Sequence, residues 1–106
     1  MNNPANKQDH GKLRYDLVPA FPLEELVKVY TMGAQKYAPD NWRKGMSWLR
    51  VFAAIMRHLW LWRQGISRDS ESGLSHLAHA AWGCLTLIEY SKTHPELDDR
   101  SEEEHL

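Results

Sequence analysis

The chain has 106 residues, of which 42% are hydrophobic and 25% are charged, and its formal net charge at pH 7 is −1. This length provides one small hydrophobic core and therefore one domain. The near-zero charge argues against an extended nucleic-acid interface, and no apolar run is long enough to cross a bilayer. We therefore expect a globular protein that has neither nucleic acid nor membrane as its partner.

Cysteine and tryptophan counts add two expectations. Cys84 is the single cysteine, so an internal disulfide is impossible and a reducing, cytoplasmic location is expected. Cys84 lies in an apolar helical pattern, which predicts that it is buried in the core. The five tryptophans are too many for one small domain to bury, which predicts that some face a second subunit or a base.

The two ends of the chain lack helical periodicity. Residues 1–10 are polar and residues 93–106 end in an acidic run, so both segments are expected to be weakly ordered around a working domain of 11–92. Between residues 12 and 17, polar and apolar side chains alternate. This period of two predicts an extended arm that lies on a surface, with Lys12 and Arg14 on its polar edge.

Three segments then show the apolar spacing of helices. The first is predicted over 22–38, with Pro22 in its first turn and a break at the following Pro-Asp-Asn sequence. The second is predicted over 48–64, with Ser47 as its N-cap. The third is predicted over 73–92 and is apolar nearly all round, which is typical of a central or interfacial helix.

These elements predict an all-α fold. We expect a short-looped helical bundle of three main helices with an extended N-terminal arm. Because three helices alone would leave much apolar surface in water, we expect oligomerisation to complete the bundle, as a homodimer or a homotetramer.

Metal-binding residue types gather before and within the third predicted helix. His76 and His79 share one helical face, Asp69 and Glu71 precede them, and His58 lies on the second helix. Imidazoles combined with carboxylates suit zinc, manganese, cobalt or nickel, whereas magnesium prefers oxygen ligands alone. This pattern predicts a metal site; the alternative is that the histidines only form hydrogen bonds inside the bundle.

Other residue types in the chain suit a phosphorylated ligand. Carboxylates that could act as the base are Glu25, Asp69 and Glu71, although Glu25 could instead only complement the helix dipole. Cations that could bind phosphates are Lys12, Arg14, Lys36 and Arg57. Tyr37 and Trp42 offer aromatic rings that could stack on a base, and Asn41 offers an amide that could read the edge of the base. For Tyr37 and Trp42 the alternative is packing in the core or an interface.

Five sequence blocks together resemble one known family. They are Gly11–Pro19, Tyr30–Tyr37, Asn41-Trp42, Met56–Trp60 and Glu71–Trp82. Over about residues 11–90 the chain resembles the phage-associated dATP/dGTP diphosphohydrolase N-terminal domain family. The resemblance implies a relation to the all-α MazG-like nucleotide pyrophosphohydrolases, which are oligomeric and hold magnesium or manganese on carboxylates. It also implies a purine nucleotide as substrate and, for a phage protein, the host cytoplasm as location.

The chain departs from the MazG-like signature at its acidic positions. Glu24 and Glu25 are adjacent instead of spaced by three, and His76 and His79 occupy the later position where that signature has acids. The hypothesis is therefore metal-dependent hydrolysis of dATP or dGTP to the monophosphate. The metal would lie near His58, Glu71, His76 and His79, Lys36 and Arg57 would neutralise the phosphates, and Glu25 or Asp69 would be the base.

Two other hypotheses compete with hydrolysis. The first is a non-hydrolysing nucleotide-binding module that sequesters a phosphorylated nucleotide signal or modulates a partner; the missing carboxylate quartet motivates it. The second is a structural helical module whose histidines only pack.

Overall fold

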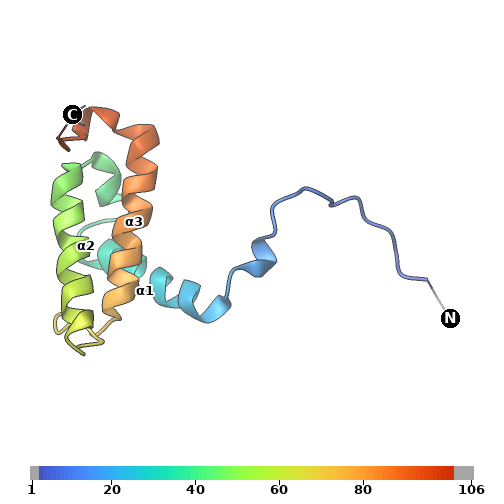
Figure 1. Cartoon of the computed structure of the whole chain (residues 1–106), viewed down its shortest axis with the longest axis horizontal. Coiled ribbons are helices and arrows are strands. Elements are labelled where there is room, and N and C mark those ends of the chain that lie inside the picture. Colours follow the sequence, from blue (N-terminus) through green and yellow to red (C-terminus); the bar gives the residue numbers. More distant parts are fainter. Residues whose placement is uncertain (1–2, 102–106) are drawn as a thin grey trace, which may run out of the picture.

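A computed structural model describes residues 3–101 of the chain (Figure 1). It contains the helices α1 (Ala20–Lys36), α2 (Trp48–Arg63) and α3 (His76–Thr93). Three short 3-10 helices, Tyr15–Leu17, Asn41–Lys44 and Pro95–Leu97, lie between and beyond them. Among the described residues the only β-type pairing is an isolated bridge between Arg68 and Ser75. The all-α prediction is confirmed.

Local sequence signals explain where the helices begin and end. Ser47 caps α2 as predicted, because its Oγ accepts a hydrogen bond from the Arg50 amide. α1 begins at Ala20, two residues earlier than predicted, which places Pro22 in the first turn, where its missing N–H costs no helical hydrogen bond. α3 begins at His76 and not at residue 73, because the Ser75 hydroxyl caps it and Gly73 has a φ of 72°.

α3 is the central helix, and it packs against both α1 and α2 (Figure 1). At its contact with α2, Val51 and Ile55 are buried against Gly83. A Cβ atom at Gly83 would lie 2.4 Å from Cγ1 of Ile55, so only glycine permits this separation of the two helices.

An aromatic cluster connects α1 to α3. The Tyr30 ring meets the edges of Trp42 and Trp82, with ring centroids 6.1 and 6.4 Å apart. Fully buried Tyr90 donates its hydroxyl proton to the carbonyl oxygen of Trp42. These contacts pack the segment that follows α1 against the core.

The segment after α3 turns back to the start of α2. The Trp48 indole donates to the His94 carbonyl oxygen at 3.1 Å, and Asp99 accepts a hydrogen bond from the Leu49 amide at 3.0 Å. Residues beyond 92 therefore contribute contacts to the bundle, and the domain limits of 11–92 stay a prediction. Residues 1–2 and 102–106, which belong to the predicted weakly ordered ends, lie outside the described residues.

The N-terminal arm extends away from the bundle (Figure 1). All its described residues up to Pro19 are exposed, and Arg14 pairs with Asp16 within the arm. The arm is extended, as predicted, apart from a 3-10 turn at Tyr15–Leu17. That it lies on a surface stays a prediction.

Two further results concern surface and membrane. Cys84 is exposed, so the prediction that it is buried is wrong; α1 and α2 cover other sides of α3. Within residues 3–101, no helix combines the length and the apolar composition that a membrane span requires.

Candidate metal centre

The loop between α2 and α3 folds into a closed turn that fixes Asp69. The Asp69 amide donates to the Leu74 carbonyl, and the Gly73 amide donates back to the Asp69 carbonyl, each at 2.8 Å. The Asp69 carboxylate accepts hydrogen bonds from the amides of Glu71 and Ser72 at 3.0 and 2.8 Å. The loop backbone thus orients the carboxylate without help from any helix.

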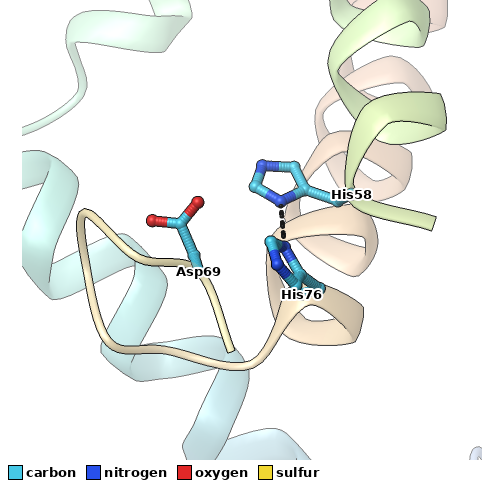
Figure 2. A group of neighbouring side chains, drawn as sticks. All are labelled: His58, Asp69 and His76. Carbon is cyan, nitrogen blue, oxygen red and sulfur yellow. Dashed lines mark hydrogen bonds between the residues drawn. The ribbon is translucent and has the colours of Figure 1, made fainter. Parts of the chain in front are cut away.

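Two histidines from different helices lie opposite this carboxylate (Figure 2). His58 comes from α2, and His76 is the first residue of α3. Their Nδ1 atoms are 2.9 Å apart, and His76 is only 1% exposed. One nitrogen of each ring and one oxygen of Asp69 lie within 4.8 Å of one another.

A third histidine lies beside the pair. The ring of His79 stacks on that of His58, with centroids 4.6 Å apart and an interplanar angle of 4°. Nε2 of His79 is 2.7 Å from Oγ of Ser72, which also accepts a hydrogen bond from the Leu74 amide. The Ser72 hydroxyl and Nε2 of His79 therefore share a hydrogen bond that fixes the orientation of the ring.

Burial and hydrogen bonding set the charges of these groups. Burial lowers the pKa of His58, and the neighbouring His79 and His76 lower it further. Burial also lowers the pKa of His79, against an opposing effect of Asp69. For Asp69, burial raises the pKa, but hydrogen bonds from Ser72 outweigh it and hold the pKa below its usual value. These shifts favour neutral imidazoles at His58 and His79 and an ionised carboxylate at Asp69 at neutral pH.

This donor set fits a divalent metal ion. Neutral imidazole nitrogens and a carboxylate oxygen are the usual ligands of zinc and its neighbours in the transition series. The Nδ1 atoms of His58 and His76, 2.9 Å apart, share a hydrogen bond. Two ligand atoms of a tetrahedral site with metal–ligand distances of about 2.0–2.1 Å lie roughly 3.3 Å apart, so the two rings would move slightly apart to admit an ion. The residues that could hold such an ion are His58, Asp69 and His76, with His79 in contact.

The predicted carboxylates other than Asp69 lie outside this cluster. Glu71 points to solvent, where its carboxylate is 2.6 Å from Nζ of Lys36 and its side chain is 76% exposed. Glu25 pairs with Lys28, one turn along α1. The sequence grouped both Asp69 and Glu71 with the histidines and also named both as candidate bases; the structure brings Asp69 to His58 and His76 and leaves Glu71 outside the cluster.

The predicted phosphate-binding cations lie in three places. Lys36, at the end of α1, contacts the loop through Glu71, and exposed Arg57 precedes His58 on α2. Lys12 and Arg14 lie on the arm and line an open concavity of about 760 Å³ there. Lys36 is thereby tied to the loop that carries Asp69.

The predicted base-contacting residues follow α1. Tyr37 is exposed, with Nζ of Lys36 5.3 Å from its ring centroid. Asn41 is half-buried at the start of the 3-10 helix. Trp42 belongs to the aromatic cluster, and the guanidinium of Arg43 lies 4.5 Å from its ring centroid, so one ring face is already occupied.

Ser72 has a role that the sequence analysis did not assign. Because α3 begins at His76, Ser72 belongs to the loop and contacts His79 instead of a helix N-terminus. The spacing of Asp69 and Ser72 is typical of turns in which an aspartate side chain accepts from the following backbone amides, and this signal could have revealed the loop geometry.

The fold and the site define a class: a helical domain with a two-histidine, one-carboxylate cluster at the closed end of a helical hairpin. The chain belongs to the family described as dATP/dGTP diphosphohydrolase, N-terminal, whose profile matches residues 2–100. The family predicted from the sequence blocks is confirmed.

A relative from Salmonella phage PMBT28, named dATP/dGTP diphosphohydrolase, is 35% identical over 94 residues. These residues are 89% of this chain but 32% of the relative, so the chain spans about a third of that protein's length. No solved structure matches the chain.

Proposed function

We propose that this domain hydrolyses purine deoxynucleoside triphosphates, dATP or dGTP, to their monophosphates with the help of a divalent metal ion. The observation that carries the proposal is the convergence of His58, Asp69 and His76 from two helices and their connecting loop. The name of the phage relative supports the substrate class, although that protein is about three times longer.

The protonation states of the cluster residues indicate their roles in metal binding. His58 is neutral because burial lowers its pKa, so it offers a lone pair at neutral pH. The low pKa of Asp69 suits it to hold a cation and makes it a weak base near pH 7. A divalent ion bound there would polarise a phosphoryl oxygen and offset developing negative charge. We therefore assign Asp69 as a ligand of the metal ion. Ser72 holds the His79 ring by a hydrogen bond, and the His79 ring in turn positions the His58 ring that stacks on it.

Glu71 and Lys36 are assigned to substrate handling. Both side chains of their ion pair are largely exposed, so water screens the attraction and the pair exchanges partners at little cost. Binding of a triphosphate would give Lys36 a more highly charged partner and release Glu71 to accept a proton from the attacking water. Glu25 remains the alternative base, and Arg57 is a second cation for the phosphates.

The base of the nucleotide is assigned to the surface after α1. Tyr37 presents an exposed ring, and half-buried Asn41 offers both a donor and an acceptor. Trp42 contributes less to stacking, because it packs in the aromatic cluster.

One observation favours a second function. The cluster contains a single carboxylate, whereas the predicted MazG-like relatives hold their metal on several. This favours the non-hydrolysing module that binds and sequesters a purine nucleotide. The relation to MazG-like enzymes itself stays a prediction.

The test compares turnover and binding in the same protein. Purified full chain is incubated with each of the four deoxynucleoside triphosphates and with magnesium, manganese, cobalt or zinc, and nucleotide products are separated by chromatography. We expect dAMP or dGMP from the purine substrates, and loss of product in His76→Gln but not in His94→Gln, a histidine outside the cluster. Calorimetric binding without turnover would identify the module, and neither turnover nor binding would refute both proposals.

A further inference from the structure

One face of the α2–α3 hairpin stays open to solvent. On α2 its residues follow one another at intervals of three, four and three: Leu49, Phe52, Met56 and Leu59, all exposed. On α3 they follow at intervals of four, three and four: Leu77, Ala81, Cys84 and Ile88, of which only Ala81 is half-buried. We call these eight residues the open face.

The two rows lie side by side on the same side of the hairpin. A groove of about 550 Å³ runs between Leu49 and Phe52 of α2 and Leu87 and Ile88 of α3. α1 cannot cover this face, because it packs against another side of α3, where Tyr30 meets Trp82. The exposed rows of α2 and α3 therefore share one side of the hairpin and meet in this groove at the end where α2 begins.

The spacing of both rows is that of helices that pack along their length. Alternating intervals of three and four keep apolar side chains in one line, which is the seam of coiled coils and of most four-helix bundles. α2 and α3 have 16 and 18 residues, enough for two such repeats. An antiparallel pair of helices with one continuous apolar face is half of a four-helix bundle.

We propose that a second copy of this chain covers the open face, so that two α2–α3 hairpins form a four-helix bundle around a twofold axis. A twofold axis that lays α2 of each copy on α3 of the other makes the face self-complementary. It brings bulky Phe52 and Met56 of one copy against the small residues Ala81 and Cys84 of the other, as side-chain packing requires.

Area and charge also favour a copy of the same chain. Phe52, Met56 and Ile88 are 48%, 46% and 68% exposed. With the remaining residues, the face offers on the order of 500 Å² of apolar surface per copy, the larger part of the roughly 800 Å² that each partner buries in a stable interface. None of the eight residues is charged, and Arg100, which lines one end of the groove, is already paired with Asp98. A charged partner surface would therefore lose water without gaining an ion pair.

Sedimentation equilibrium of the full chain at micromolar concentration tests the proposal. We expect twice the mass of the 12.4 kDa chain. The variant Met56→Glu should weaken self-association by about tenfold or more, because it buries an unpaired carboxylate in the centre of the interface. The matched control is Phe21→Glu, which changes an equally apolar, more exposed side chain on α1 and should remain dimeric.

A second measurement does not depend on a destabilising substitution. Native Cys84 lies in the middle of the open face, so a short bismaleimide should join two wild-type chains covalently. The variant Cys84→Ser, Phe21→Cys, whose only thiol lies on α1, should give little cross-linked dimer. A monomeric wild-type chain would overturn the proposal. So would a dimer that Phe21→Glu dissociates and Met56→Glu does not, because this result would assign the contact to α1 or the arm.

Discussion

Replacing Gly83 by alanine tests the packing of α2 on α3 most directly. Two opposing effects set the result. Alanine favours the helix over glycine by about 1 kcal/mol. Against this, the new Cβ would lie 2.4 Å from Cγ1 and 2.9 Å from Cδ1 of Ile55. Ile55 is β-branched and buried, so its Cγ1 cannot rotate away freely and the helices must separate.

Overpacking of a core by one methyl group costs about 1–3 kcal/mol, and we expect the clash at Gly83 to lie at the upper end of this range. The net loss for Gly83→Ala is then about 1–2 kcal/mol, which lowers the melting temperature by roughly 4–8 °C per kcal/mol. The matched control is Gly33→Ala in α1, where no atom lies within 4 Å of the added Cβ. That variant should be stabilised by up to about 1 kcal/mol.

Both variants are melted by circular dichroism at one protein concentration, beside the wild type. The reasoning predicts opposite signs for two chemically identical substitutions. If Gly83→Ala melted at or above the temperature of the wild type, the close approach of α2 and α3 at this position would be wrong, whatever Gly33→Ala does.

Three further predictions concern the N-cap of α2, metal binding and the pH dependence of stability. Ser47→Ala should lower the free energy of unfolding by about 1 kcal/mol, measured by urea denaturation, because it removes the α2 N-cap; an unchanged midpoint would contradict the cap. His76→Gln should weaken zinc or manganese binding by at least about tenfold in calorimetric titration, whereas equal affinity would exclude His76 as a ligand. Burial lowers the pKa of His58 and His79, so the unfolded chain binds more protons than the folded chain, and metal-free protein should lose stability as the pH falls through about 6.5. The hydrogen bond of His94 to a backbone carbonyl raises the pKa of His94, so this residue stabilises the folded chain as the pH falls. The melting temperatures of the wild type, His58→Gln and His94→Gln are therefore compared from pH 8 to 5. An equal loss of stability at acid pH in the wild type and His58→Gln would refute the lowered pKa of His58.

The sequence predicted the helices better than the contacts between them. Ser47 and the glycine at 65 are strong signals of a helix start and end, and α2 follows them to within one residue. The sequence does not specify the start of α3, since serines at 72 and 75 both precede an apolar run and only Ser75 caps the helix. The third helix is apolar on nearly all sides, and its sequence pattern does not tell which side the other helices leave uncovered. This is why the pattern predicts a buried Cys84, whereas the structure exposes it.

For the metal centre, the sequence supplied the residue types but not their partners. The spacing of His76 and His79 predicts that they share a helix face. It does not predict that His76 shares a hydrogen bond with His58 while His79 stacks on the His58 ring, because that depends on how the connecting loop closes. Asp69 and Glu71 are near neighbours in that loop and point in different directions: one accepts hydrogen bonds from the loop amides, and the other reaches Lys36. Such divergence arises from backbone turns that residue types alone do not specify.

Because His58 and His76 belong to different helices and are 18 positions apart, an ion held between them would act as a removable cross-link. By analogy with a disulfide that closes a loop of this length, such a link would restrict the unfolded chain by roughly 3 kcal/mol. Chelation would then loosen the hairpin as well as empty the site. The rigidity of the whole bundle would follow the supply of metal in its surroundings.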